Sequence, residues 1–261
     1  MTPSARLQAA IDILQGLNAT AQPADRFMRD WFRTRRFAGS GDRREITELI
    51  YRILRHRFSF AWRMGDDSPR ALVIAALLAE GRDPVPLFTG NYGPAPLTES
   101  ELHSIGVPPG ETPLWVKGEF PQFLEEQLTR RFGGRLLDEM ASFQDRAPVD
   151  LRVNRLKASR DDVLAALKQD GFDCAAIGLN AIRCPPGVHL DKHRLFLSGA
   201  FETQDLAAQI AVERAGVKPG MTVLDMAAGA GGKALALAAA MENKGLITAT
   251  DVRAAALAEL M

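Results

Sequence analysis

One stretch of the chain has the residue types and spacing of a nucleotide-binding turn: Asp225-Met226-Ala227-Ala228-Gly229-Ala230-Gly231-Gly232-Lys233. It follows the β-rich run 221–224 and precedes the Ala/Leu-rich run 233–241, which favours a helix. Glycines permit a tight turn and let a ligand approach the backbone, and the free N–H groups at a helix start point toward that ligand. A strand, a glycine turn and a helix in this order predict a corner that binds a nucleotide-containing cofactor.

Several chemistries use such a corner. A phosphate-binding P-loop requires Gly-x4-Gly-Lys-Ser/Thr, but Ala227 stands at the first glycine and Ala234 at the hydroxyl, so this class is excluded. The run 229–234 does fit the dinucleotide pattern Gly-x-Gly-x-x-Ala, and Asp251 follows the next predicted strand, 246–250, where an acid can bind ribose hydroxyls. NAD is therefore one candidate ligand.

S-adenosylmethionine (SAM) uses the same corner and the same acid, so spacing alone does not separate it from NAD. Two residues favour SAM. Asp225 ends the first strand, where a carboxylate can face a cationic ligand, and Lys233 is unfavourable at a helix start unless it serves a ligand. A strand–helix joint that binds nothing is the remaining alternative.

The composition sets the broad class. A chain of 261 residues that is 46% hydrophobic and 25% charged is typical of a globular protein of about two domains. The longest apolar run, 71–79, is too short to cross a bilayer, and no signal peptide is evident. Two cysteines without metal-ligand spacing fit a reducing cytoplasm better than a disulfide scaffold. We expect a cytoplasmic monomer with no membrane segment and no metal.

The first 64 residues are strongly basic. They hold twelve Arg, no Lys and six acids, a net charge of +6, although the whole chain is neutral. The guanidinium fork suits phosphate oxygens, so this face predicts contact with nucleic acid, with Arg33, Arg35 and Arg36 as candidates. The alternative is a solvated helical surface on which Arg stems cover apolar neighbours. Trp31 and Trp62 lie at helical spacing among apolar residues and are predicted to be core.

Apolar periodicity divides the chain into three folded parts. An all-helical bundle is predicted over 1–82, a Pro/Gly-rich linker over 83–119, a small α+β layer of the ferredoxin-like kind over 120–200, and the start of a doubly wound α/β domain over 201–261. The predicted helices are 4–18, 24–37, 42–57, 71–79, 120–132, 136–143, 160–169, 206–215 and 233–241; the predicted strands are 149–154, 172–177, 181–184, 195–197, 221–224 and 246–250.

Three motifs together resemble a known family. The stretch 225–233 is similar to the SAM motif of the Sun-type RNA cytosine-5 methyltransferases, Asp-x-Cys/Ala-Ala-Ala/Gly-Pro-Gly-Gly-Lys-Thr, with Ala230 and Ala234 replacing Pro and Thr. The stretch 151–157 resembles the family's Arg-Val-Asn-x-Leu-Lys strand. The stretch 199–209 resembles its Gly-x-Phe-x-x-Gln-Asp-x-x-Ser-Gln segment, with Ala208 replacing Ser. The helical part, with 41–45, resembles the NusB-like domain of bacterial members.

The resemblance implies the roles of individual residues. A Rossmann-like SAM methyltransferase fold would begin near 201, and the cofactor would be held by Ala227, Ala228, Gly229, Ala230, Gly231, Gly232, Lys233 and Asp251. Arg152, Asn154 and Lys157 would face RNA. The alternative for these three is that Asn154 bonds the backbone while the two cations are solvated.

The resemblance also implies that the reaction needs a part of the family's sequence that lies beyond residue 261. In the family a cysteine thiolate attacks C6 of cytosine, and both catalytic cysteines follow the ribose-binding acid. Cys174 and Cys184 precede the glycine corner and are expected to be partly buried thiols without a catalytic role. We therefore expect an N-terminal fragment, inactive alone, of an enzyme that methylates C5 of cytosine in RNA, with ribosomal RNA as the expected substrate. A non-catalytic RNA-binding protein and an NAD-dependent oxidoreductase are the alternatives.

Overall fold

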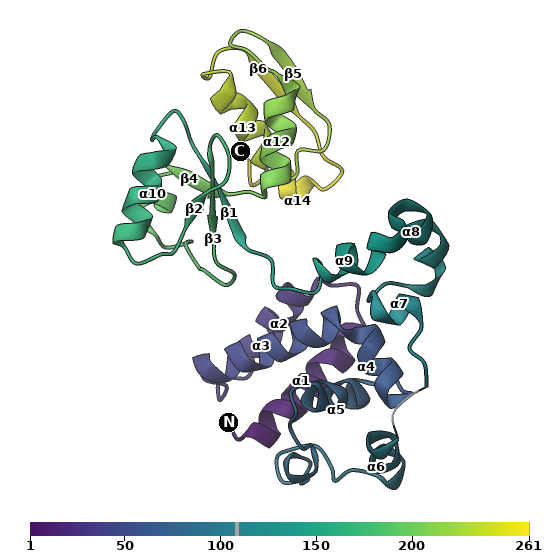
Figure 1. The fold of residues 1–261 in the computed structure, drawn as a ribbon. Coiled ribbons are helices and arrows are strands. Elements are labelled where there is room, and N and C mark those ends of the chain that lie inside the picture. The colour runs from purple at the N-terminus through teal and green to yellow at the C-terminus, as the bar shows by residue number, and fades with distance from the viewer. Residues whose placement is uncertain (108–109, 261) are drawn as a thin grey trace. The chain divides into compact units, whose positions relative to one another are not determined.

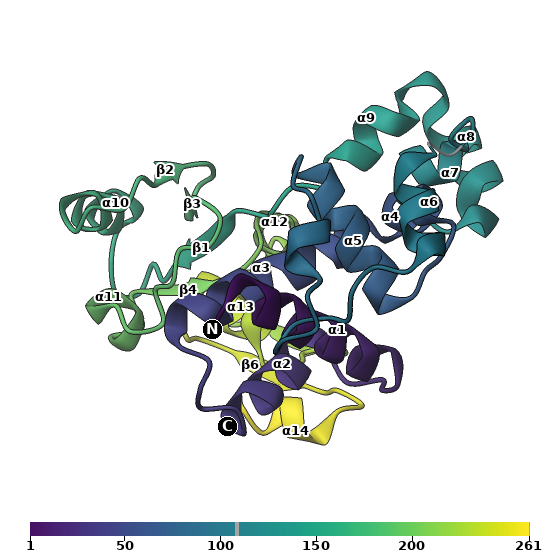
Figure 2. The same cartoon turned by 90° about the horizontal axis from the view of Figure 1, so that it is seen from below.

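The computed structural model describes residues 1–107 and 110–260, which form two compact units, Met1–Asp145 and Arg146–Met261. The first unit is helical, and the second combines helices with two small sheets (Figures 1 and 2). No helix of the described residues is long and apolar enough to span a membrane.

Five helices build the core of the first unit. They are α1 (Pro3–Asn18), α2 (Ala24–Arg33), α3 (Ser40–Arg55), α4 (Arg57–Met64) and α5 (Pro69–Ala79). The apolar face of α1 packs against α3 and α5, with Ala10, Ile13, Ile46, Ile50 and Ile74 fully buried. The predicted all-α arrangement of this part is therefore present in the structure.

Side-chain caps set where several of these helices begin. The hydroxyls of Thr2 and Ser68 accept N–H groups in the first turns of α1 and α5, and both helices carry Pro in that turn. Helix α3 starts before the predicted position 42, because its N-cap is Gly39. Asp42 is the third residue of the helix, and its carboxylate accepts the Gly39 N–H at 3.1 Å. The helix therefore begins at Ser40 and ends before His56.

The segment after α5 contains short helical elements. They are η1 (Val85–Leu87), α6 (Glu99–Gly106), α7 (Leu114–Lys117), η2 (Gln122–Leu124), α8 (Glu125–Phe132), η3 (Gly133–Arg135) and α9 (Leu136–Ala141). Phe88 and Val116 in this segment are buried. Part of the Pro/Gly-rich stretch predicted as a linker therefore packs on the helical unit, and residues 120–145 belong to the same compact unit.

The second unit begins with a four-stranded antiparallel sheet in the order β2-β3-β1-β4. Its elements are β1 (Val149–Val153), α10 (Arg160–Gln169), β2 (Ala175–Ala176), β3 (Ala181–Cys184), α11 (Arg194–Leu197) and β4 (Phe201–Thr203). Leu151, Val153, Ile182 and Phe201 pack with α10 to form a buried core. This is the predicted small α+β layer.

The opposite face of this sheet is polar because side chains alternate along each strand. Asp150 and Arg152 on β1 stand opposite Arg183 on β3 and Glu202 on β4. Helix α12 (Leu206–Ala215) follows β4 and contacts β1, and its Leu206 N–H donates to the Asp150 carboxylate at 3.1 Å. The polar face of the sheet thus anchors the start of α12.

The chain then forms the predicted strand–helix–strand corner. β5 (Thr222–Asp225) pairs in parallel with β6 (Leu246–Ala249), and α13 (Gly232–Ala240) connects them. Val212 of α12, Leu237 of α13 and Val223 of β5 share a small apolar cluster. Figure 1 shows α12 and α13 side by side next to the two strands. Helix α14 (Ala254–Leu257) follows β6.

One predicted strand in the second unit and the end of one predicted helix in the first unit are wrong, and one strand was not predicted. Residues 195–197 form part of helix α11 and not a strand, because His193 Nδ1 caps its start by accepting the Leu195 N–H. The strand in this region is β4, at 201–203. It was not predicted, because three residues are too few to show an alternation of apolar and polar side chains. The helix predicted over 24–37 ends at Arg33.

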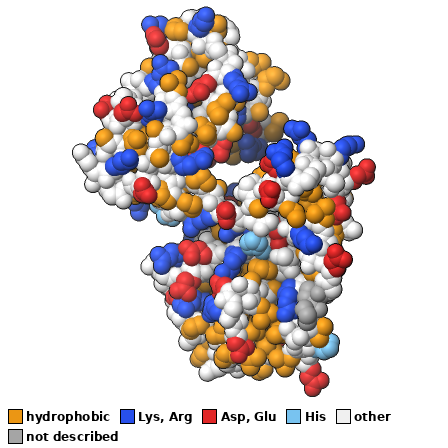
Figure 3. All heavy atoms as spheres, in the orientation of Figure 1, with side chains coloured by type: hydrophobic (Ala, Val, Ile, Leu, Met, Phe, Trp, Pro, Cys, Tyr) orange, Lys and Arg blue, Asp and Glu red, His pale blue; other side chains and the backbone are white. Residues whose placement is uncertain are grey.

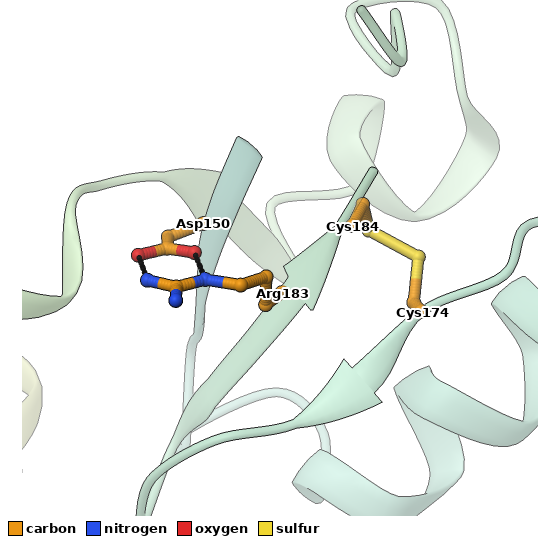
Figure 4. The surroundings of a disulfide bond; sticks show 4 residues. All are labelled: Asp150, Cys174, Arg183 and Cys184. Carbon is orange, nitrogen blue, oxygen red and sulfur yellow. Dashed lines mark hydrogen bonds and ion pairs between the residues drawn. A yellow bond between two sulfur atoms is a disulfide. The ribbon is translucent and has the colours of Figure 1, made fainter. Parts of the chain in front are cut away.

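The prediction that the two cysteines are separate, partly buried thiols is also wrong. Cys174 and Cys184 are 2% and 0% exposed and form a disulfide (Figure 4). The pairing of β2 with β3 explains this, since Ala175 lies opposite Arg183 and the next pair outward is therefore Cys174 with Cys184. Their Cα atoms are 4.3 Å apart, as in directly opposed residues of an antiparallel pair.

Candidate functional site

The glycine corner has the backbone geometry that its sequence predicts. Gly229 and Gly231 have φ angles of +57° and +89°, a region that glycine adopts without steric cost. Gly231 is the N-cap of α13, whose first residue is Gly232. Among the described residues, no acceptor pairs with the N–H groups of Ala230, Gly232 and Lys233. The start of α13 therefore presents backbone donors that a ligand could use.

Asp251 closes the corner from the end of β6. Its Oδ2 accepts the Gly229 N–H at 2.8 Å, and its Oδ1 accepts the Arg253 N–H at 2.8 Å and Arg253 Nε at 3.2 Å. The Arg253 backbone N–H, the Arg253 side chain and the Gly229 N–H together lower the pKa of Asp251 to about 2. A carboxylate oxygen can accept more than one donor, so Oδ2 keeps capacity for a hydroxyl group.

Asp225 contributes a second acid at the end of β5. Its side chain is 9% exposed, and Oδ1 accepts the Ala227 N–H at 3.3 Å. Its Oδ2 is buried and takes no hydrogen bond from the described residues. A buried acceptor without a donor is costly, so this oxygen is a natural partner for a polar or cationic ligand group.

Gln204 also reaches the corner, although the sequence gave no reason to include it. A Cβ placed on Gly232 would lie 3.4 Å from Gln204 Nε2. Gln209 Nε2 donates to the Gln204 carbonyl at 2.8 Å, and the Oε1 atoms of both glutamines are buried without a partner among the described residues. The signal that could have found Gln204 is its place in the motif 199–209, directly before Asp205, the N-cap of α12.

Other predicted cofactor residues differ in exposure. Ala227, Ala230, Gly232 and Lys233 are exposed, whereas Ala228 and Gly231 are buried. The Ala228 N–H donates to Thr250 O, which joins the loop to the end of β6. Leu260 packs directly on Gly231, where an added Cβ would come within 2.2 Å of its Cδ1. The structure therefore brings all eight predicted cofactor residues to one corner.

The three residues predicted to face RNA from the β1 region bond to residues 198–202 of the same unit. Arg152 is 6% exposed and its Nη2 pairs with Glu202 at 2.5 Å. Asn154 donates to Gly199 O at 3.2 Å, and Lys157 Nζ donates to Ser198 O at 2.7 Å. These bonds join the motif 151–157 to residues 198–202, at the start of the motif 199–209. The backbone role held open for Asn154 is the one seen here.

The Arg-rich face of the first unit is more open. Arg33 and Arg36 are exposed, while the Arg35 guanidinium lies 4.0 Å from the centroid of the Trp31 ring. Beside them are two exposed aromatic rings, Phe37 at 68% and Tyr92 at 84%. Figure 3 shows basic, acidic and apolar side chains interspersed on the surface of this unit.

The sequence analysis did not identify Phe37 and Tyr92 as candidate binding residues. Phe37 was assigned to a helix, and Tyr92 lies in the Pro/Gly-rich segment that reads as a linker. In the structure Trp31, Arg35, Phe37 and Tyr92 line one pocket of about 370 Å³. An aromatic residue within a run of turn-forming residues is the signal that could have found Tyr92.

Comparisons with known proteins agree with the motifs. Residues 120–194 match the family model of the RsmF/B-like methyltransferase ferredoxin-like domain. The chain is 28% identical over 175 residues to the probable ribosomal RNA small subunit methyltransferase B of Bacillus subtilis, covering 62% of this chain and 39% of that protein. It is 31% identical over 127 residues to the 26S rRNA (cytosine-C(5))-methyltransferase nsun-1 of Caenorhabditis elegans, covering 46% and 18%.

The chain thus spans less than half the length of these curated relatives. Among solved structures, the crystal structure of PH0851 superposes with a TM-score of 0.69 and 21% identity, covering 100% of this chain and 66% of that one, which shows a shared fold. Three motifs in the family's order and the matched ferredoxin-like domain agree: the chain is similar to the Sun-type RNA cytosine-5 methyltransferases and carries the ferredoxin-like domain of their RsmF/B-like members.

Proposed function

We propose that this chain is part of a cytoplasmic SAM-dependent enzyme that methylates C5 of cytosine in RNA, with ribosomal RNA as the substrate class. The observation that carries the proposal is the corner in which Gly229, Gly231 and Asp251 meet at the start of α13. We further propose that α1–α5 are a NusB-like domain, and that β5, α13 and β6 begin a Rossmann-like fold. We also propose 1–82, 83–119, 120–200 and 201–261 as the family's domain and linker divisions, with residues up to Asp145 folded in the same compact unit as α1–α5.

The residues of the corner fit the cofactor. SAM would supply the methyl group and carries a sulfonium charge, a ribose and a methionine end. Asp251 would hold the ribose hydroxyls, and the free N–H groups at the start of α13 would receive the methionine end together with Ala227 and Ala228. The buried, unpartnered Oδ2 of Asp225 offers an acceptor to a cationic ligand.

The thiolate that the family's reaction requires does not come from the two cysteines of this chain. A sulfur held in a disulfide is not a thiolate, and Cys174 and Cys184 are also buried in the α+β layer. We therefore propose that this chain binds cofactor and RNA without transferring a methyl group by itself.

RNA contact is proposed for two surfaces. On the helical unit, Arg33, Arg35 and Arg36 provide cations beside the rings of Phe37 and Tyr92, the combination that binds phosphates and stacks unpaired bases. In the second unit, Arg152, Asn154 and Lys157 shape the β1–β4 region. Since Arg152 is buried there, we propose that it supports the RNA-facing loop around 155–157 and that Lys157 contacts phosphate.

Calorimetry tests the cofactor assignment. Titration of the 1–261 chain with SAM should give saturable binding, titration with NAD should give none, and Asp251→Ala should abolish the SAM signal. The variant Asp161→Ala removes the same charge from an exposed acid that is not part of the corner, and it should bind SAM as the wild type does. Binding of NAD without SAM would reject the proposal.

Salt dependence tests the RNA assignment. Affinity for a 20-nucleotide single-stranded RNA should fall steeply with salt, because phosphate binding releases counterions. Changing Arg33, Arg35 and Arg36 to Gln should weaken binding and flatten the salt slope. The matched triple change of Arg130, Arg131 and Arg135 to Gln should do neither. Equal losses in both triple variants would remove the assignment of this face.

A further inference from the structure

Three aromatic rings form a groove on the first unit at a place apart from the Arg-rich face. Phe58 and Trp62 lie one turn apart on α4, and Trp115 of α7 packs against both. The ring centroids of Trp115 and Phe58 are 5.6 Å apart at 83°, and those of Trp115 and Trp62 are 6.5 Å apart at 82°. Trp62 is therefore not a core residue as predicted but a half-buried wall of this groove.

Glu119 holds the two helices that form the groove in place. Its carboxylate is 6% exposed and accepts the N–H groups of Phe58 at 2.9 Å and Ser59 at 3.2 Å in the first turn of α4. The residue itself has a φ of +54°, so the chain after α7 turns back sharply to reach α4. The position of Trp115 relative to Phe58 is thus fixed by a charged cap.

The open end of the groove is acidic. The groove measures about 670 Å³ and is lined by Phe58, Ala61, Trp62, Gly65, Asp66, Asp67 and Trp115. It runs to the C-terminus of α4, where carbonyl groups add partial negative charge. The Asp66 carboxylate accepts only from Ser68 N and Oγ among the described residues, at 2.9 and 2.7 Å. Asp67 is 76% exposed and lies 3.7 Å from Arg57 Nη2.

Nearby cations also bond to groups outside the groove. Arg63 donates to the carbonyls of Ser104, Ile105 and Val107, and Arg57 also donates to Asn18 Oδ1. The groove therefore combines ring faces, to which a cation is attracted, with carboxylates that are only partly neutralised. This combination repels phosphate and is complementary to a guanidinium or ammonium group.

We propose that this groove binds an arginine-containing segment of a partner protein, with the guanidinium group against the indole rings and beside Asp66 and Asp67. A planar guanidinium stacks on aromatic faces and pairs with carboxylates in a fork, which an ammonium does less well.

The test uses the full 1–261 chain and a fluorescein-labelled peptide made of four Gly-Gly-Arg repeats. Fluorescence polarisation should show saturable binding. The same peptide with citrulline, which keeps the shape of arginine but removes the charge, should bind at least tenfold more weakly. The double change Asp66→Asn and Asp67→Asn should weaken binding at least fivefold. Glu126→Gln with Asp138→Asn, a matched change at two exposed acids outside the groove, should leave it unchanged.

The location is tested separately. In a Trp31→Phe background the remaining tryptophans near the peptide are Trp62 and Trp115, so their fluorescence should change with the same affinity. Trp115→Phe, checked for unaltered thermal unfolding, should weaken binding severalfold. Equal affinity for the citrulline peptide, or no effect of Asp66→Asn with Asp67→Asn, would overturn the proposal. A third result would also overturn it: the double variant binds a 12-nucleotide RNA more tightly than the wild type does, and the RNA quenches Trp62 and Trp115. The groove would then be a site for RNA.

Discussion

The Asp251 carboxylate accepts the Gly229 N–H at 2.8 Å, which ties the acid after β6 to the glycine turn after β5. Besides the pairing of β5 with β6, the Ala228 N–H bond to Thr250 O also links these loops. The bond from Gly229 to Asp251 places the acid predicted to bind ribose against the turn predicted to bind the methionine end. The two halves of the cofactor corner are therefore coupled before any ligand arrives.

The first prediction concerns the charge of Asp251. Its pKa is lowered to about 2, below the usual value of about 3.9. Its stabilising bonds are thus fully present above about pH 4 and are lost as the pH falls toward 2. At pH 3 the carboxyl should be only about one tenth protonated, against about nine tenths for an unperturbed group. The amide proton shift of Gly229, followed by NMR from pH 6 to 3, should therefore stay nearly constant. A midpoint near pH 4 would contradict this.

The second prediction concerns Gly231. Its φ of +89° is strained for any residue with a Cβ, and that Cβ would meet Leu260. Gly231→Ala should lower the free energy of unfolding by about 1 to 3 kcal/mol. Gly232→Ala is the matched control, because an added Cβ there meets Gln204 Nε2 only at 3.4 Å. Urea unfolding of both variants checks the difference, and equal costs would show that the backbone of Gly231 is not constrained.

The third prediction concerns the ion pair on the polar face of the sheet (Figure 4). Asp150 is 5% exposed and accepts Arg183 Nε at 2.7 Å and Nη2 at 2.8 Å, as well as the Leu206 N–H. Asp150→Ala should cost about 2 to 3 kcal/mol, because it leaves Arg183 and the start of α12 without an acceptor. Asp161→Ala, which removes an exposed partner of Arg160, should cost less than about 1 kcal/mol.

The pH dependence of the same pair has a definite sign. Arg183 above all lowers the pKa of Asp150, and the Leu206 N–H adds to the effect. A folded pKa below the unfolded value means that the stabilisation is present above about pH 4 and is lost as the pH falls. The difference in unfolding free energy between wild type and Asp150→Ala should therefore narrow on acidification from pH 6. A constant difference over that range would show that the carboxylate charge contributes nothing.

The sequence predicted the elements that carry strong local patterns. Helices 160–169 and 206–215 match α10 and α12 in their bounds, because Ser159 and Asp205 cap them and Gly171 and Gly216 follow them. The glycine corner could be predicted equally well, since its turn requires glycines at fixed positions. In both cases the local residue types determine the backbone.

What sequence could not supply were contacts between distant segments. The bonds from Asn154 to Gly199 and from Lys157 to Ser198 join two motifs more than forty residues apart, and nothing local encodes that β1 pairs with β4. The approach of Gln204 to Gly232 and the aromatic groove of α4 and α7 depend on tertiary packing in the same way. The pairing of Cys174 with Cys184 depends on the register of β2 with β3.

The last prediction concerns that disulfide, which closes a loop with a sequence separation of 10. Chain-entropy arguments give about 3 kcal/mol for cross-linking a loop of this length. Urea unfolding of the wild type with and without dithiothreitol should therefore differ by about this amount. The double variant Cys174→Ala with Cys184→Ala should be insensitive to the reductant, which separates loss of the cross-link from a general effect of the reagent. Two reactive thiols per chain, measured in urea without reductant on freshly purified protein, would instead show that the bridge does not form and that both sulfurs pack as thiols in the core of the α+β layer.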